Sequence, residues 1–118
     1  MATILVVDDN RDIEDAIGAL LKQCGYQVWV VYDGQEALSN AAVYLPEAVL
    51  LDIGIPSIDG IEVARQLRKT QVNSVRIVAC TGYAQEAIRD QLRDAPFDVI
   101  LQKPVALETI LDALTGSA

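Results

Sequence analysis

The sequence predicts an α/β fold: an open, doubly wound parallel sheet of five strands with helices on both of its faces. Short apolar runs alternate five times with segments of helical periodicity, which is the pattern of successive strand–helix units joined by right-handed crossovers. Five such units are too few to close an eight-stranded barrel. The 118 residues contain no linker, low-complexity tract or charge block, so we expect residues 1–118 to form a single domain.

The expected strands are short apolar runs bounded by polar residues. The run at residues 4–7, Ile-Leu-Val-Val, is uninterrupted and is followed by two acids. A run of this kind is typical of a strand that is buried on both faces, as in the middle of a parallel sheet. By the same reasoning, we expect the five strands at residues 4–7, 28–31, 48–51, 77–80 and 99–101.

The segment after the first strand carries the clearest helical stripe. From Ile13 to Cys24, its apolar residues recur at i, i+3, i+4, i+7, i+8 and i+11, which is one face of an amphipathic helix. Asn10 is the expected N-cap, and Gly25 stands where a glycine commonly ends a helix. The first helix is therefore expected between these two residues.

Shorter stripes predict four more helices, and two of these carry a capping signal. Asp33 stands three residues before Glu36, and Asp59 stands three residues before Glu62, which is the spacing of a capping box. Capping explains both aspartates without a role in chemistry. The stripes consist of Ala37, Leu38, Ala41 and Ala42; of Ile61, Ala64 and Leu67; of Ala84, Ala87, Ile88 and Leu92, in a weakly amphipathic helix over residues 84–93; and of Leu107, Ile110, Leu111 and Leu114.

The charge balance and the missing residue types exclude several classes of function. Nine Lys and Arg against 17 Asp and Glu give a formal net charge of −8, and such a surface repels phosphate backbones, so we expect no direct nucleic-acid partner. The chain has no His, which removes the Ser-His-Asp triad and His-ligated zinc. Cys24 and Cys80 lie far apart in the sequence, and we expect both to be small buried hydrophobes in a reducing cytosol.

The sequence carries no targeting or membrane signal. The N-terminal segment turns acidic after four apolar residues, unlike a signal peptide. No apolar run approaches the roughly 20 residues that a membrane-spanning helix needs. We therefore expect a cytoplasmic protein that has no membrane partner.

Polar residues that could carry chemistry follow four of the five expected strands: Asp8 and Asp9, then Asp52, then Thr81, then Lys103. In a doubly wound sheet, ligands bind beyond the carboxyl ends of the strands. If the first and third strands are neighbours, the three aspartates come close together, and their mutual repulsion favours a bound cation. With no His or Cys nearby, these oxygen ligands favour Mg²⁺.

The same residue types match phosphoryl transfer to a carboxylate. Asp52 would attack phosphorus as a nucleophile, while Mg²⁺, Lys103 and Thr81 would hold the oxygens of the transferred group. The seven glycines form neither G-x-G-x-x-G nor a Walker P-loop, so no nucleotide-binding loop is expected. We therefore expect a donor that arrives as an already activated phosphoryl group.

Four stretches of the chain resemble a known family. They are I-L-V-V-D-D-N at 4–10, V-L-L-D-I-G-I-P-S-I-D-G at 49–60, A-C-T-G at 79–82 and K-P at 103–104. In this order and spacing, they are similar to CheY-like receiver domains of bacterial two-component signalling, across essentially the whole chain. The resemblance implies a flavodoxin-like sheet with the strand order 2-1-3-4-5.

The resemblance also implies the phosphoryl donor and the metal ligands. Asp52 corresponds to the phosphoacceptor, which takes a phosphoryl group from a phosphohistidine on a sensor histidine kinase or a histidine phosphotransfer domain. Asp9 would bind Mg²⁺ directly, and Asp8 would bind it chiefly through water. Gly54 would contribute its backbone carbonyl to the metal.

Further positions follow from the same resemblance. Thr81 and Lys103 would contact the aspartyl phosphate, and the positions of Gly54 and Tyr83 tune how fast the phosphoryl group is hydrolysed in such proteins. The family often has Tyr or Phe three residues before the lysine. This chain has Ile100 there, so it departs from the family at the position whose aromatic side chain usually couples to Thr81.

Two alternatives compete with a phosphoryl-accepting switch. One is a receiver-like protein-binding module that works without phosphorylation, through the surface of the fourth helix, fifth strand and fifth helix. The complete acidic set disfavours it, and Ile100 favours it mildly. The other is a phosphatase or mutase with an aspartate nucleophile, which would need a D-x-D-x-[TV] order, whereas Asp9 follows Asp8 directly.

We therefore expect a receiver that catalyses only its own phosphorylation and dephosphorylation and is not an enzyme with a separate substrate. Its output would be either a shape change that a downstream effector protein reads or relay of the phosphoryl group. The stretches D-I-G-I-P and F-D-x-x-L-x-K-P resemble receivers joined to hybrid histidine kinases as much as free-standing ones.

Overall fold

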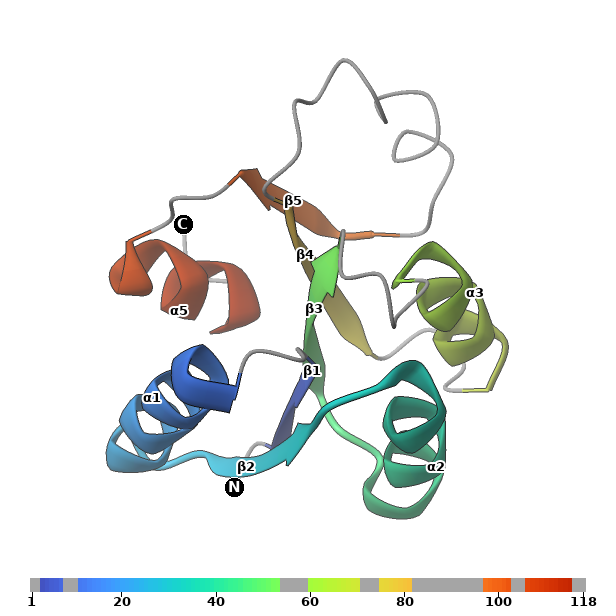
Figure 1. Ribbon diagram of the computed structural model, residues 1–118, viewed down its shortest axis with the longest axis horizontal. Helices are drawn as coiled ribbons and strands as arrows, with labels where there is room; N and C mark the ends of the chain where they lie inside the picture. The colour runs from blue at the N-terminus through green and yellow to red at the C-terminus, as the bar shows by residue number, and fades with distance from the viewer. Residues whose placement is uncertain are drawn as a thin grey trace.

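The computed structural model of the chain describes residues 3–7, 11–53, 60–70, 75–81, 97–102 and 106–115. From Thr3 to Thr81, strands and helices alternate along these residues (Figure 1). In chain order, the elements are β1 (Thr3–Val7), α1 (Arg11–Gln23), β2 (Gln27–Val31), α2 (Gly34–Tyr44), β3 (Ala48–Ile53), α3 (Gly60–Thr70), β4 (Arg76–Thr81), β5 (Val99–Gln102) and α5 (Leu107–Thr115).

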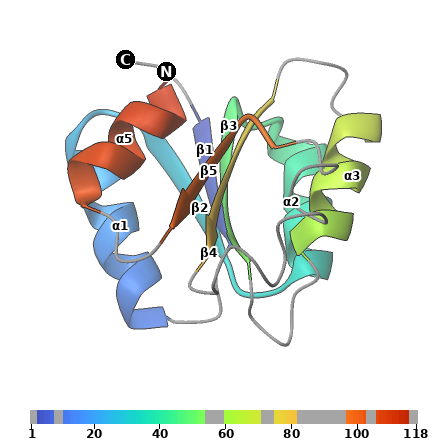
Figure 2. The ribbon, with the colours of Figure 1, turned by 90° about the horizontal axis from the view of Figure 1, so that it is seen from above.

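The five strands form one parallel sheet in the order β2-β1-β3-β4-β5. Figure 2 shows three layers, with α1 and α5 on one face of the sheet and α2 and α3 on the other. The prediction of an open, doubly wound, flavodoxin-like sheet is thus confirmed, including the strand order. The order reverses between β1 and β3, and ligands of doubly wound sheets bind at the carboxyl ends of the strands beside such a reversal.

Each face of the sheet has its own buried core. The middle strand β3 contributes to both, because successive strand residues point to opposite faces: Val49 and Leu51 pack in the cluster under α2 and α3, and Ala48 and Leu50 pack in the cluster under α1 and α5. All four are at most 5% exposed. The apolar run of β3, like the run of β1, therefore corresponds to a strand covered on both sides, as expected.

The end of α1 confirms one expectation and corrects another. Gly25 has a φ of +96°, and the N–H groups of Gly25 and Tyr26 donate to the carbonyls of Lys22 and Leu21, which is a Schellman motif. The prediction that Cys24 is buried was wrong, since this residue is exposed. The helix ends at Gln23, so Cys24 lies in the turn, and the next side chain to pack on the core under α1 and α5 is Tyr26. Cys80 is buried as expected.

Asp33 caps the second helix, as the spacing predicted. Its side chain accepts a hydrogen bond of 2.7 Å from the backbone N–H of Glu36 at the start of α2. Asn10, Asp59 and the helix expected at 84–93 lie outside the described residues. None of the helices in the described part of the chain is both long and apolar enough to cross a membrane.

Candidate functional site

The reversal of strand order brings the ends of β1 and β3 together. The two strands are neighbours, and Val7, the last residue of β1, lies opposite Leu51. The prediction of an acidic site required the first and third strands to be neighbours, and they are. The last residue of β1 lies opposite the residue that precedes Asp52. Asp8 and Asp9 themselves lie outside the described residues.

β3 extends two residues further than the apolar run predicted. It ends at Ile53 rather than Leu51, so Asp52 belongs to the strand instead of following it. Its backbone lies opposite Cys80 of β4, and Ile53 lies opposite Thr81. The extension has a tertiary cause, because β4 continues to Thr81 and pairs with these two residues.

Neighbouring strands place the expected phosphoryl contacts close to one another. Asp52 and Thr81 stand on adjacent strands, one rung apart, and adjacent strands of a sheet are about 4.8 Å apart. Thr81 in turn lies opposite Gln102 of β5, which is the residue before Lys103. The structure describes the backbone but not the side chains of Asp52 and Thr81, and Lys103 lies outside the described residues.

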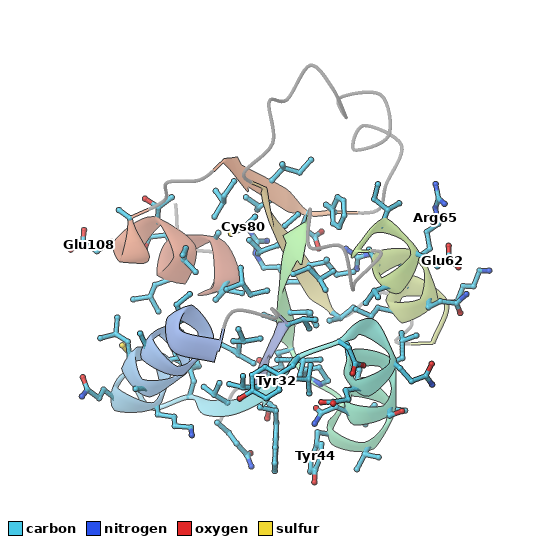
Figure 3. The ribbon with its side chains drawn as sticks, viewed as in Figure 1. Tyr32, Tyr44, Glu62, Arg65, Cys80 and Glu108 are labelled. Atoms are coloured by element: carbon cyan, nitrogen blue, oxygen red, sulfur yellow. The ribbon has the colours of Figure 1, made fainter. Side chains whose placement is uncertain are left out.

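Buried residues surround the backbone of Asp52. Leu51 before it is fully buried, and Cys80 opposite it is 5% exposed. Cys80 lies between the sheet and α5 (Figure 3), in the same buried cluster as Ile110 and Leu114. A central strand packed on both faces is a rigid support, and rigid support of reacting groups is what phosphoryl transfer requires.

The described side chains offer no metal site of their own. Within the described ranges, no three acidic or thiol side chains converge on a point that could hold an ion. Asp33, which follows β2 at the same edge of the sheet, is engaged as the cap of α2. The expected metal ligands Asp8, Asp9 and Gly54 lie outside the described residues, as does the expected modulating residue Tyr83.

Ile100, the position where the chain departs from the family pattern, lies on an edge strand. It stands on β5, opposite Ala79 of β4, and it is 38% exposed. Its neighbours Val99 and Leu101 pack against the core under α1 and α5. An aliphatic side chain is therefore presented to solvent here, at the edge of the sheet.

An ionic cluster that no sequence pattern predicted lies at the opposite ends of the strands. Arg68 of α3 forms an ion pair with Asp98, which directly precedes β5. Arg68 also donates to the backbone carbonyl of Val75 at 2.5 Å, and Asp98 accepts a hydrogen bond of 2.7 Å from the N–H of Ile77. No periodicity links two residues 30 positions apart, so only the tertiary structure reveals this pairing.

Comparison with known proteins agrees with this geometry. The family model of the response regulator receiver domain matches residues 4–115. The chain is 42% identical over 108 residues to the response regulator MprA of Mycolicibacterium vanbaalenii, which covers 92% of this chain and 46% of that protein. The MprA of Mycobacterium avium is 41% identical, with 92% and 47% covered. The chain thus spans about half the length of these curated relatives.

Solved structures resemble the fold along nearly the whole chain. A response regulator of Burkholderia pseudomallei, crystallised with a phosphorylated aspartic acid, a calcium ion and citrate, is 31% identical, with a TM-score of 0.87 over 97% of this chain and 66% of that one. The response regulator TrrA of Thermotoga maritima, in complex with Mg²⁺–BeF, is 29% identical, with a TM-score of 0.84 over the whole of both chains.

A third similar structure is a CheY-like receiver domain protein of Methanospirillum hungatei. It is 26% identical, with a TM-score of 0.88 over 98% of this chain and 92% of that one. The family model, the curated relatives and the strand order of the sheet agree with one another. This chain therefore belongs to the family of response regulator receiver domains.

Proposed function

We propose that the chain is a Mg²⁺-dependent phosphoacceptor that takes a phosphoryl group onto Asp52 from a phosphohistidine of a partner protein. Asp8, Asp9 and Asp52 hold the metal ion together with the backbone carbonyl of Gly54. Thr81 and Lys103 contact the phosphoryl oxygens. The proposed site therefore consists of six residues. The partner is a sensor histidine kinase or a histidine phosphotransfer domain, and the protein acts in the cytoplasm.

The observation that carries this proposal is the register of the central strands. Asp52 lies inside β3, one residue beyond the rung that joins Leu51 to the end of β1, and one rung from Thr81 of β4. β5 continues the same line, with Gln102 opposite Thr81. The ends of β1, β4 and β5 thus lie at the same edge of the sheet as Asp52, which supports a shared site.

The chemistry of these donors fits a hard divalent ion. Carboxylates and a backbone carbonyl supply only oxygen ligands, and oxygen ligands in small number suit Mg²⁺. When bound, Mg²⁺ neutralises the negative charge that gathers on the transferred phosphoryl group. The Thermotoga relative in complex with Mg²⁺–BeF and the Burkholderia relative with calcium and phosphorylated aspartic acid support a divalent cation beside the acceptor.

In the transfer step, a carboxylate oxygen of Asp52 forms a bond to phosphorus as the bond between phosphorus and the donor imidazole nitrogen breaks. The imidazole keeps the electron pair and takes up a proton from water, and Asp52 becomes an acyl phosphate. The Lys103 ammonium and the Thr81 hydroxyl stabilise the phosphoryl oxygens during transfer. Later attack by water on phosphorus releases inorganic phosphate and restores the carboxylate, so no separate substrate is turned over.

The mass of the intact protein after incubation with acetyl phosphate tests the proposal. We expect the wild-type protein to gain one phosphoryl group in the presence of Mg²⁺ and none after chelation. Asp52→Asn should gain none, because the amide lacks the nucleophilic carboxylate. Asp33→Asn is the matched control, because Asp33 lies at the same edge of the sheet but serves as the cap of α2. This variant should gain the phosphoryl group as the wild type does.

A negative result would favour the alternative function. If the folded wild-type protein binds Mg²⁺ but gains no phosphoryl group from acetyl phosphate or from a phosphohistidine protein, the phosphoacceptor proposal is wrong. A binding module that works without phosphorylation would then be favoured, and the exposed Ile100 on β5 would be the first position to test for partner contact.

A further inference from the structure

An ionic cluster holds the start of β5, and we call it the Arg68–Asp98 clamp. One Asp98 carboxylate oxygen accepts hydrogen bonds from the Arg68 guanidinium and from the backbone N–H of Ile77. The N–H of Asp98 donates to the carbonyl of Ile77 at 2.8 Å, so Asp98 binds both backbone groups of one β4 residue. Arg68 also donates to the carbonyl of Val75, which ties α3 to the same point.

Among the described residues, few contacts besides the clamp determine the register of β5. It has four residues, and in the described part of the chain it lies at the edge of the sheet, paired with β4 alone. Val99 and Leu101 pack on the core while Ile100 is exposed. A shift of one residue along β4 would reverse this alternation, but a shift of two residues would preserve it, because the side-chain period of a strand is two.

The clamp distinguishes between these registers. Its hydrogen bonds connect Asp98 to Ile77, so the next rung joins Val99 to Val78 and the last rung joins Gln102 to Thr81. A shift of two residues would move Gln102 by about 7 Å along β4, at about 3.3 Å per residue. It would also move the Asp98 carboxylate away from the Arg68 guanidinium and the Ile77 N–H, and hydrogen bonds to a charged group stabilise more than those between neutral groups.

We infer that Asp98, held by Arg68, is a positioning residue for Lys103. This inference rests on the proposed function, in which Lys103 contacts the phosphoryl group. The clamp lies about 13 Å from Gln102, four residues at about 3.3 Å each, so it cannot touch the phosphoryl group itself. It acts by setting the point on β4 at which the chain leaves β5 toward Lys103.

A double-mutant cycle between Asp98 and Lys103 tests this inference. The rate at which acetyl phosphate phosphorylates the protein in Mg²⁺ is measured for wild type, Asp98→Ala, Lys103→Met and the double variant. We expect Asp98→Ala to slow phosphorylation on the order of tenfold, since a misplacement of about 1 Å can cost as much as 100-fold. In the Lys103→Met background, Asp98→Ala should alter the rate by less than about twofold. The effects of two substitutions add when the residues act independently and do not add when one acts through the other.

Three further measurements distinguish a positioning role of Asp98 from a general loss of stability of the fold. Asp98→Asn, which keeps an oxygen to accept from Ile77 but lacks the charge that pairs with Arg68, should slow phosphorylation less than Asp98→Ala and serves if the alanine variant does not fold. The Mg²⁺ dissociation constant, measured by calorimetry, should be unchanged in both. Arg65→Gln is the matched control, because Arg65 forms an exposed ion pair with Glu62 on the outer side of α3 (Figure 3) and should not affect the rate.

Equal slowing by Asp98→Ala in both backgrounds, or no slowing in either, would overturn the positioning role. A weakened Mg²⁺ affinity in Asp98→Asn would do the same, since the effect would then not be confined to Lys103. These outcomes differ from failure of the proposed function. If the wild-type protein gains no phosphoryl group, or if Lys103→Met leaves its rate unchanged, the function itself is wrong and the inference falls with it.

Discussion

At the amino ends of the strands, hydrogen bonds link neighbouring strands, whereas at the carboxyl ends the sequence places acids, a hydroxyl and an ammonium. The N–H of Glu47 donates to the carbonyl of Thr3 at 2.8 Å, and the N–H of Arg76 donates to the carbonyl of Glu47 at 2.9 Å. The Arg76 guanidinium donates to the carbonyl of Ala113 in α5, and the Arg68–Asp98 clamp extends the series to β5.

The difference between the two ends shows how structure and chemistry are divided along the strands. Matched donors and acceptors at the amino ends stabilise the fold, because the polar groups named above find partners there. If the acids expected at the carboxyl ends lie close together, they repel one another and destabilise the fold until a cation binds. Substitutions at the amino ends should therefore change stability first, and substitutions at the carboxyl ends should change phosphorylation first.

The largest expected effect on stability comes from a buried leucine near the amino ends. Leu67 of α3 is fully buried in the core under α2 and α3, and Leu67→Ala should lower the free energy of unfolding by about 2–5 kcal/mol because it leaves a cavity. Urea denaturation measures this. The matched control is Leu45→Ala, since Leu45 is 65% exposed and its loss should cost less than about 0.5 kcal/mol.

The contrast between the two ends would be weakened if Leu67→Ala stopped phosphorylation of protein that remains folded. It would also be weakened if both leucine variants were equally stable, because burial would then not determine the effect.

A smaller effect on stability is expected from Mg²⁺ at the carboxyl ends. An ion that binds only the folded state should raise the free energy of unfolding of the wild type by up to about 2.7 kcal/mol when its free concentration is 100 times Kd. Asp9→Asn should lose this gain, and without Mg²⁺ it should be at least as stable as the wild type because one repulsive charge is removed. Denaturation with and without Mg²⁺ measures both effects.

Glu108→Gln is the control for this experiment, because Glu108 is an exposed acid on the outer side of α5 (Figure 3). It removes the same charge and should leave the Mg²⁺ effect intact. Equal stabilisation by Mg²⁺ of the Asp9 variant and the wild type would exclude Asp9 as a ligand.

The smallest expected effect concerns Asp33, an acid at the carboxyl ends whose role is to cap a helix. Asp33 caps α2 by accepting from the N–H of Glu36, and Asp33→Ala should lower the free energy of unfolding by about 1 kcal/mol. Phosphorylation should be unchanged. Asp33→Asn keeps a capping oxygen and should be close to the wild type in both measurements. Loss of phosphorylation at unchanged stability would instead assign Asp33 to the site.

Much of the fold could be predicted because its signals are local. Uninterrupted apolar runs predicted all five strands, and the cap of α2 and the glycine that ends α1 followed from spacings of a few residues. The errors arose where a neighbour in space decides. Cys24 continues the apolar stripe in sequence, yet it is exposed because the chain has already turned toward β2. β3 continues past Leu51 because β4 lies beside it and pairs with Asp52 and Ile53.

The candidate site divides in the same way. Its residues could be predicted from the sequence, because polar residues that directly follow apolar runs form a recognisable pattern. The site's side chains remain predictions, and the structure contributes the register that brings β1, β3, β4 and β5 to one place. Asp98 belongs to the stretch F-D-x-x-L-x-K-P, but no pattern paired it with Arg68, since a salt bridge between a helix and the start of an edge strand has no period.

The sequence by itself determined the class of the fold, the number of strands and the residue types at their carboxyl ends. The fold class and the number of strands follow from hydrophobic periodicity and capping, which act between residues within one or two turns of each other. The residue types are read directly from the sequence. Only the tertiary structure decided the extent of β3, the exposure of Cys24 and the partners of Asp98. These depend on which distant backbone and charged groups meet, because a polar group that leaves water takes whichever partner the packing of the whole chain brings to it.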